Sequence, residues 1–341
     1  MLDLVARQDI LWLGTILSFS LVLSFGTVAL LRITAVRLRF IDRPNGNTGN
    51  VGGAALGGGV GIVVATLVTL WLFPSSAGAQ LHITAMMVAL CALGLLDDIF
   101  KLTPLVKVLG QAACAALYII PEAMNLRGAA FVMLFLIVSS NAWNVVDVMD
   151  SLLASIGAVA MFGISIVMLI HGLDPRGLPS ISLVVSGALI GFLVWNRPPA
   201  RVIMGDAGSL PLGMVYGALV VESFSDSALL ALAVLLPGLI PYLEVGFLMV
   251  QRSRKGVPFY RSTPDHFALR LLHNGSTIAQ IVKPVIWAGS GLVALACLLE
   301  LTSFHTVLTI ASAVLLAGAV VWAYRYLSRL RVGSSARDTG P

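Results

Sequence analysis

Five aspartates stand at or near the ends of apolar segments, where their carboxylates could bind a cation or take up a proton: Asp97, Asp98, Asp147, Asp150 and Asp206. A carboxylate within a membrane segment costs roughly 2.5–3.5 kcal/mol at a helix centre, so such residues usually line a cavity or a site. Carboxylates that share one surface repel one another unless a cation, basic residues or shifted protonation compensates. Hard oxygen ligands favour Mg²⁺, which in turn favours phosphate-bearing substrates. The pattern therefore indicates phosphate chemistry.

The spacing of the polar residues supports one shared pocket. Asn141, Asn144, Asp147 and Asp150 recur every third position, and on a helix the last three stay within an arc of about 120°. Asp206 follows a glycine and precedes Ala-Gly-Ser, whose small residues let backbone amides approach an anion. Its carboxylate could meanwhile hold a metal. Any one of the five aspartates could instead be a helix cap or a topology signal, but this explanation is poor for all five.

The composition shows which elements must position these residues. The chain has 341 residues, of which 58% are hydrophobic and 11% charged, whereas about a quarter of a typical soluble domain is charged. There is too little polar sequence to cover a soluble core. We predict an all-α, polytopic membrane protein with one domain over residues 1–330 and a disordered cytoplasmic tail over 331–341. The net charge of +5 comes from short basic clusters between apolar runs, so no nucleic acid partner is expected.

A membrane-spanning helix needs about 20 mostly apolar residues, and the sequence offers about eleven such segments. They are Ile10–Leu31, Val51–Phe73, Leu81–Leu96, Leu105–Ile120, Ala129–Val145, Leu152–Ile170, Pro179–Trp195, Leu210–Val221, Ala228–Val250, Pro284–Leu301 and Phe304–Tyr324.

The basic residues predict the orientation in the membrane. Of the 21 Lys and Arg, all but Arg7, Arg127 and Arg176 fall on one side of this arrangement, and cytoplasmic loops collect such residues. The N-terminus is therefore expected outside and the C-terminus in the cytoplasm. The five aspartates fall on the same, cytoplasmic side. The glycine-rich stretch 52–61 should let backbone approach another helix or a ligand closely.

Four ordered runs carry a resemblance to a known family: Gly-Leu-Leu-Asp-Asp at 94–98, Lys-Val-Leu-Gly-Gln at 107–111, Asn-Ala-Trp-Asn-Val-Val-Asp-Val-Met-Asp at 141–150 and Met-Gly-Asp-Ala-Gly-Ser at 204–209. Each run alone is a weak signal. Together with the hydropathy pattern they resemble the polyprenyl-phosphate N-acetylhexosamine-1-phosphate transferases of glycosyltransferase family 4. This superfamily includes phospho-N-acetylmuramoyl-pentapeptide transferase and undecaprenyl-phosphate N-acetylglucosamine-1-phosphate transferases.

The resemblance implies a ten- or eleven-helix enzyme of the bacterial cytoplasmic membrane. It implies a UDP-N-acetylhexosamine donor, undecaprenyl or another polyprenyl phosphate as acceptor within the membrane lipid, release of UMP, and a cell-envelope glycan as the later product. The implied cofactor is Mg²⁺, with Mn²⁺ able to replace it, and a homodimer is compatible with the resemblance.

The resemblance also implies roles for individual residues. Metal ligands would be Asp206 and Asp97, and catalytic residues Asp97, Asp98, Asp147, Asp150 and His266. Substrate contacts would be Lys107, Gln111, Asn141, Asn144, Asn196, which matches an asparagine that meets the nucleoside, and Arg261. Asp97 and Asp98 would serve the lipid phosphate or the metal, and which of them accepts a proton stays open.

Departures from the family pattern bear on the donor sugar. Val148, Met149 and Ser151 replace family residues around the two aspartates, and Ile203 stands where an aromatic residue is common. The family's histidine cluster is reduced to Pro264-Asp265-His266 with Arg270 following, which favours a simple UDP-sugar over the UDP-muramoyl-pentapeptide. Two rival functions remain open. One is an inactive family member that acts as an assembly partner, and the other is a secondary transporter. Glu244, near the middle of a predicted span, is either functional or a neutral buried acid.

Overall fold

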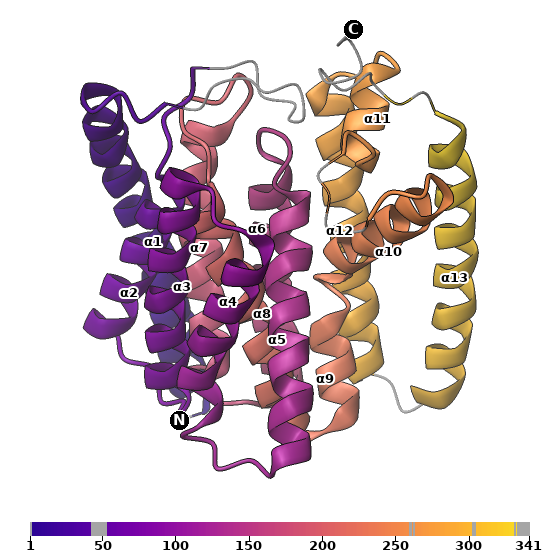
Figure 1. Ribbon diagram of the computed structural model, residues 1–341. Helices are drawn as coiled ribbons and strands as arrows, with labels where there is room; N and C mark the ends of the chain where they lie inside the picture. The colour runs from indigo at the N-terminus through magenta and orange to yellow at the C-terminus, as the bar shows by residue number, and fades with distance from the viewer. Residues whose placement is uncertain are drawn as a thin grey trace, which may run out of the picture.

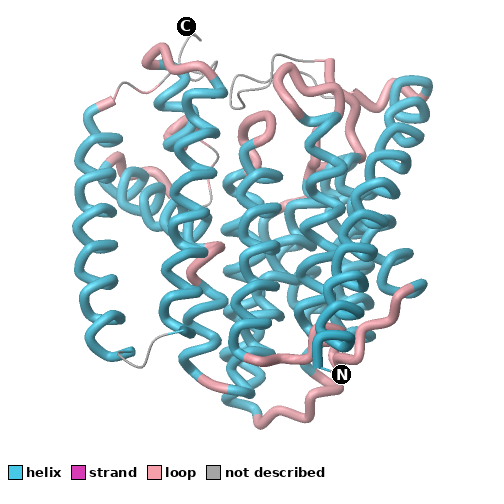
Figure 2. The backbone as a smooth tube through the Cα atoms, turned by 180° about the vertical axis from the view of Figure 1, so that it is seen from behind, coloured by secondary structure: helices cyan, strands magenta, loops and turns pink. Residues whose placement is uncertain are grey.

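The computed structural model describes residues 2–41, 53–258, 261, 263–301, 305–330 and 332. Within these ranges the chain is helical, with two isolated β-bridges and no longer strand (Figure 2). The helices are α1 (Leu2–Arg37), α2 (Gly58–Leu72), α3 (Gln80–Phe100), α4 (Pro104–Ile119), α5 (Leu126–Val146), α6 (Leu152–His171), α7 (Leu178–Asn196), α8 (Asp206–Asp226), α9 (Ala228–Leu235), α10 (Leu239–Arg254), α11 (Phe267–His273), α12 (Ile278–Leu301) and α13 (His305–Arg329). The predicted tail 331–341 lies outside the described residues, except for residue 332.

Local sequence signals explain several helix starts. The Thr103 hydroxyl accepts the Val106 N–H, and Pro104 occupies the first turn of α4. The Asn125 side chain accepts the Gly128 N–H at the start of α5, 2.9 Å away. Such caps satisfy backbone donors that have no partner within the helix. The start of α8 differs, because its preceding residue is Gly205, which has no side chain to offer.

The helices are long and apolar enough for a multi-pass membrane protein. Among the described residues, eight helices qualify as candidate spans, or up to nine if the α9–α10 pair is counted as one. The predicted span Ala228–Val250 is not straight, since α9 and α10 meet at 71°. Pro237 and Gly238 lie at the break, where proline lacks the amide that a continuous helix needs. The predicted spans over 51–73 and 105–120 correspond to the shorter apolar helices α2 and α4.

The centre of the bundle is formed by α6, α7 and α8, which are mostly buried. α8 packs against α3 and α5, α7 against α1 and α6, and α6 against α12. α13 stands at the edge, and α10 crosses toward it (Figure 1). Apolar side chains such as Trp287 and Leu315 point outward, each 75% exposed, as expected where the solvent is lipid.

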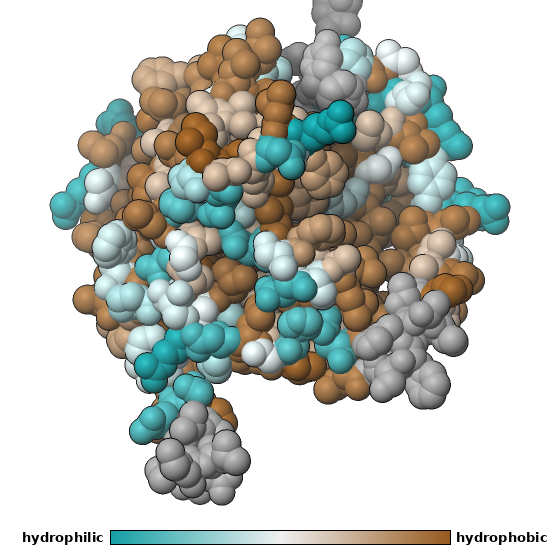
Figure 3. All heavy atoms as spheres, turned by 90° about the horizontal axis from the view of Figure 1, so that it is seen from below, coloured by the Kyte–Doolittle hydropathy of each residue, from teal (hydrophilic) through white to brown (hydrophobic). Residues whose placement is uncertain are grey.

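The two ends of the bundle are distinct. α1 begins at the lower end and α13 finishes at the upper end (Figure 1). Seen from below, polar side chains extend from the middle toward the lower left of the view, and apolar ones cover much of the remaining surface (Figure 3). The loop before α3 meets the loop before α7, where the Ser75 hydroxyl donates to the Gly177 carbonyl oxygen at 2.9 Å.

Candidate active site

The first turn of α8 lies against two other helices, and glycines make this approach feasible. A Cβ on Gly94 of α3 would lie 2.2 Å from the Asp206 carbonyl oxygen. A Cβ on Gly59 of α2 would lie 2.2 Å from the Gly208 nitrogen. The close backbone approach predicted for the glycine-rich stretch 52–61 is therefore present at Gly59. Gly205 has a φ of 70°, a conformation that favours glycine.

Carboxylates from α3 and from the loop after α5 accept the amides at the start of α8 and just before it. The N–H groups of Asp206 and Ala207 donate to the two oxygens of Asp98 at 3.1 and 3.2 Å. The Gly205 N–H donates to Asp147. The sequence led us to expect these amides to face a substrate anion, and instead the chain's own carboxylates occupy them.

The Asp206 side chain, unlike its backbone N–H, makes its contacts with α4 and α5. Its Oδ2 accepts a hydrogen bond from the Lys107 ammonium of α4. Its Oδ1 accepts from the Asn144 amide of α5 at 2.7 Å, and that amide also donates to the Ser209 hydroxyl at 2.8 Å. The Lys107 ammonium lies 3.2 Å from Asp97 Oδ2 as well. One ammonium thus joins two carboxylates from helices α3 and α8.

Asp147 and Asp150 occupy the loop after α5, and burial affects both. Burial, followed by the negative charges of Asp206 and Asp98, raises the pKa of Asp147 to about 8. Burial also raises the pKa of Asp150, whose Oδ2 accepts the Ala200 N–H at 2.8 Å. Asp147 therefore belongs to the carboxylate network, whereas Asp150 ties its loop to the segment after α7.

Asn196 holds the same two segments together. Its side-chain oxygen accepts the Ser151 N–H at 2.8 Å, and its amide donates to the Val202 carbonyl oxygen at 2.9 Å. The Ser151 hydroxyl donates to the Asn196 carbonyl oxygen at 3.1 Å. With both ends of its side chain engaged and only 6% of its surface exposed, Asn196 has a structural role in this conformation.

Gln111 and Asn141 form a partly buried amide pair one helical turn below Lys107 and Asn144. The Asn141 amide donates to Gln111 Oε1 at 2.8 Å and to the Ile137 carbonyl oxygen at 2.8 Å. Gln111 is fully buried. The pair joins α4 to α5, and so it fixes the spacing between the helices that carry Lys107 and Asn144.

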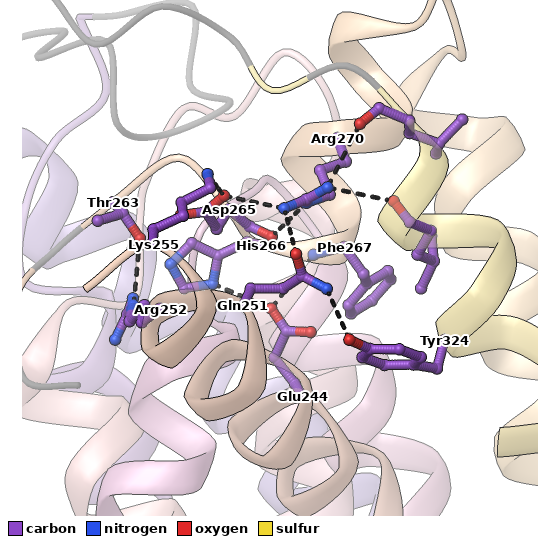
Figure 4. Close-up of polar contacts among 12 residues, drawn as sticks. Glu244, Gln251, Arg252, Lys255, Thr263, Asp265, His266, Phe267, Arg270 and Tyr324 are labelled. Atoms are coloured by element: carbon purple, nitrogen blue, oxygen red, sulfur yellow. Dashed lines mark hydrogen bonds and ion pairs between the residues drawn. The ribbon is translucent and has the colours of Figure 1, made fainter. Parts of the chain in front are cut away.

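A second polar cluster joins α10, α11 and α13 (Figure 4). Glu244 Oε1 pairs with His266 Nδ1 at 3.1 Å and accepts the Phe267 N–H at 3.2 Å. Glu244 belongs to α10, just after the bend between α9 and α10, and its carboxylate pairs with the residues at the start of α11. The side chain of Arg261 is exposed on the same loop, whereas His266 is buried, so the predicted substrate contact and the predicted catalytic residue of this loop differ in burial.

Arg270 lies at the centre of the second cluster. Its guanidinium donates to Asp265 Oδ1 at 2.9 Å, to Gln251 at 3.2 Å and to the Leu327 carbonyl oxygen at 3.2 Å (Figure 4). Burial alone would raise the pKa of Asp265, but hydrogen bonding to the Lys255 ammonium and the charges of Lys255 and Arg270 hold it below its ordinary value. Arg270 fastens the end of α13 to the loop that carries His266.

The carboxylate network suits a cation that a substrate phosphate helps to bind. Among the described residues, no group of three or more His, Cys, Asp or Glu side chains has the arrangement of a complete metal site. Mg²⁺ commonly uses one or two carboxylates and completes its shell with water and substrate phosphates. Asp97 and Asp206, which contact one ammonium, supply such a pair of hard oxygen donors.

Three features of the site were not predicted from the sequence. Ser209 joins the network through Asn144, Asp98 serves as the cap of α8, and Glu244 partners His266. The Ser209 contact could have been inferred, because Ser209 lies one helical turn after Asp206 and so shares its side of α8. The other two join residues far apart in the chain, and nothing in their local sequence signals them.

Residues 80–224 match the protein family described as Glycosyl transferase family 4. This segment contains Asp97, Lys107, Asn144 and Asp206, and it ends before the loop that carries His266. The resemblance predicted from the four motifs is confirmed for this segment.

Individual relatives show the same similarity at a distance. The chain is 28% identical over 282 residues to a Streptomyces coelicolor protein named provisionally as a glycosyltransferase, covering 81% of this chain. It is 36% identical over 149 residues to the phospho-N-acetylmuramoyl-pentapeptide-transferase of Oceanobacillus iheyensis, covering 42% of this chain. It is 34% identical over 172 residues, or 45% of this chain, to the Synechococcus enzyme of the same name. The chain spans 66%, 43% and 44% of the lengths of these three relatives, respectively.

Proposed function

We propose that this chain, whose residues 80–224 match glycosyl transferase family 4, transfers an N-acetylhexosamine-1-phosphate from a UDP-sugar to undecaprenyl or another polyprenyl phosphate. The reaction releases UMP and begins a cell-envelope glycan. The observation that carries the proposal is the convergence of Asp97, Lys107 and Asn144 on Asp206 at one end of a membrane bundle. Carboxylates beside an ammonium suit two phosphate substrates and a divalent cation.

We propose Asp206 and Asp97 as the residues that hold Mg²⁺, which Mn²⁺ could replace. Both carboxylates contact the Lys107 ammonium, so in this conformation a positively charged side chain already lies between these two hard oxygen donors. When bound, Mg²⁺ would neutralise charge on the pyrophosphate of the donor.

The chain's own residues have defined tasks in the transfer. An oxygen of the lipid phosphate bonds to the sugar-linked phosphorus, and the bond from that phosphorus to the bridging oxygen breaks, so that UMP leaves. Asp97 or Asp98 accepts any proton that the lipid phosphate still carries. Lys107 offsets negative charge on the phosphates, while Asn144 keeps Asp206 oriented. Asp147 and Asp150 border the sugar nucleotide, and His266 and Arg261 reach its pyrophosphate.

The proposed setting is the cytoplasmic face of a bacterial inner membrane. Eleven spans result when α2, α4 and the bent α9–α10 pair are added to the eight long helices. An odd number agrees with α1 starting and α13 finishing at opposite ends of the bundle (Figure 1). The lipid acceptor would enter sideways from the cytoplasmic leaflet.

The proposed donor is a simple UDP-N-acetylhexosamine, because the histidine cluster is reduced to His266. The names of the Oceanobacillus and Synechococcus relatives make the UDP-muramoyl-pentapeptide the competing donor. Transport is disfavoured because the interacting aspartates lie at helix ends, whereas transporter sites lie near the membrane midplane.

The proposal is tested by incubating the purified full chain with polyprenyl phosphate, Mg²⁺ and a panel of UDP-sugars that includes the UDP-muramoyl-pentapeptide. We expect release of UMP and a matching lipid-linked product with a UDP-N-acetylhexosamine. Turnover with the pentapeptide donor alone would overturn the choice of sugar. A folded protein that releases no UMP from any donor would instead support the assembly-partner alternative.

A further inference from the structure

We infer that Asp98 is a positioning residue that holds the start of α8, so that the Asp206 carboxylate faces Lys107 and Asn144. Asp97, its neighbour in the chain, lies in the ionic group itself. The effect of Asp98 on the reaction rests on the proposed function. The contacts of Asp98 with α8 are independent of that function.

The geometry around Asp98 is that of a helix cap supplied by another helix. Its Oδ1 accepts the Asp206 N–H at 3.1 Å and its Oδ2 accepts the Ala207 N–H at 3.2 Å. The Asp98 residue is only 9% exposed. Both oxygens are thus directed at the backbone of α8. A group so engaged is poorly placed to bind a substrate or to take a proton from one, so of the two candidates for proton acceptor in the proposed reaction this inference favours Asp97.

The electrostatics of the two helix ends favour this arrangement. Asp98 belongs to the last turn of α3, where the partial charge of the helix end is negative and a carboxylate is unfavourable. The first turn of α8 presents free N–H groups and a partial positive charge. Gly205 cannot cap these groups with a side chain. The Asp98 carboxylate of α3 therefore accepts hydrogen bonds from the free N–H groups of α8, and the partial positive charge of that helix end stabilises the carboxylate in turn.

The end of α3 and the start of α8 are packed closely together. A Cβ on Gly205 would lie 2.6 Å from Asp98 Oδ2, and a Cβ on Gly94 would lie 2.2 Å from the Asp206 carbonyl oxygen. The carboxylate and the α8 backbone are therefore in direct contact. We therefore expect a shift of the Asp98 carboxylate to disturb the backbone of Asp206.

Asp97 has different surroundings. Successive residues on a helix point about 100° apart, and Asp97 Oδ2 lies 3.2 Å from the Lys107 ammonium. Its Oδ1 accepts the Leu102 N–H at 2.8 Å. Asp97 therefore keeps one oxygen beside the cationic group that also contacts Asp206. The pair of aspartates divides into one residue within the ionic group and one that supports it.

Hydrogen–deuterium exchange of the full chain in detergent, without ligand, tests the contact. A peptide that begins before Met204 reports on the amides of Asp206 and Ala207. Asp98→Ala removes both acceptors and should speed their exchange by about tenfold, while Asp98→Asn keeps one acceptor and should speed it by about threefold. Asp97→Asn is the matched control and should leave this peptide within about twofold of wild type. If Asp98→Ala fails to fold, Asp98→Asn decides.

A magnesium titration of UMP release separates positioning from direct participation. Asp98→Asn should raise the Mg²⁺ concentration for half-maximal release by about tenfold, as loss of an outer partner of a metal ligand does. Turnover at saturating Mg²⁺ should fall by only about threefold. Asp97→Asn removes a proposed metal ligand, so it should raise that Mg²⁺ concentration and also lower turnover at saturating Mg²⁺ by far more than threefold.

Unchanged exchange in both Asp98 variants would overturn the inference. Loss of UMP release at every Mg²⁺ concentration in Asp98→Asn, with exchange unaltered, would also overturn it and place Asp98 in the reaction. A wild-type protein that releases no UMP from any donor would refute the proposed function alone, because the exchange experiment needs no substrate.

Discussion

The ammonium of Lys107 contacts the carboxylate of Asp206, although 99 positions separate these residues in the chain. The same ammonium lies 3.2 Å from Asp97. α3, α4 and α8 are thus joined at one end of the bundle by a single cation between two anions. Removal of that cation leaves two carboxylates facing each other in a partly buried place.

Lys107→Gln should destabilise the protein by roughly 1–3 kcal/mol in the absence of Mg²⁺, because the charges of Asp97 and Asp206 are then uncompensated. We expect added Mg²⁺ to restore part of the lost thermal stability and UMP release to fall sharply. Lys101→Gln is the control, since Lys101 is exposed. Melting in detergent with and without Mg²⁺ measures the effect, and equal melting of the two variants would contradict it.

Gly94→Ala should disrupt the contact between α3 and α8, because the added methyl group would meet the Asp206 carbonyl oxygen at 2.2 Å. Backbone cannot yield as a flexible side chain does, so a loss of on the order of 3 kcal/mol is expected. Gly26→Ala in α1 is the matched control, since nothing lies within 4 Å of its Cβ position. Thermal melting compares the two. A Gly94→Ala protein as stable as Gly26→Ala would show that the helices are not in contact here.

Arg270→Lys should loosen the end of α13. An ammonium cannot reproduce the fork of donors that reaches Asp265, Gln251 and the Leu327 carbonyl oxygen. We expect a loss of roughly 2–4 kcal/mol and faster proteolysis near α13. Arg261→Lys, at an exposed position, should melt like wild type. The account of this cluster fails if both variants melt and are cleaved alike.

Cysteine labelling checks the orientation in the membrane. Single cysteines at Ser75 and Arg176, which belong to two loops in contact at the lower end of the bundle, should react with an impermeant reagent added outside intact cells. A cysteine at the exposed Ser253 should react only after the cells are opened. Labelling of position 253 from outside would place the carboxylate network on the wrong face of the membrane.

Much of the fold follows from the sequence, because a membrane requires long apolar helices and their lengths can be counted. The bend between α9 and α10 could not be read from hydropathy, since apolar residues continue through Pro237 and Gly238. The start of α8 at Asp206, earlier than the predicted Leu210, depends on a cap from Asp98, which lies 108 positions away. Local sequence carries no signal for such a cap.

The residue types of the site were evident from the sequence, but their partners were not. Asp97, Asp206, Lys107 and Asn144 share one network, as four ordered motifs suggested. The contact of Asn196 with a nucleoside stays a prediction, and in this conformation the Asn196 side chain is hydrogen-bonded within the protein. A buried structural asparagine and a ligand-binding one look alike in sequence, because only the surrounding backbone distinguishes them.

The central claim is that Asp206 supplies negative charge to a cation, and Asp206→Asn tests it most directly. The substitution keeps the size of the side chain but removes the charge that a hard cation needs. UMP release is measured across a magnesium titration for wild type and variant, with thermal stability in detergent as the control for folding. We predict that magnesium-dependent release falls to background while the protein stays folded. Near-normal release with an unchanged magnesium dependence would contradict the account, because asparagine replaces a simple turn aspartate well.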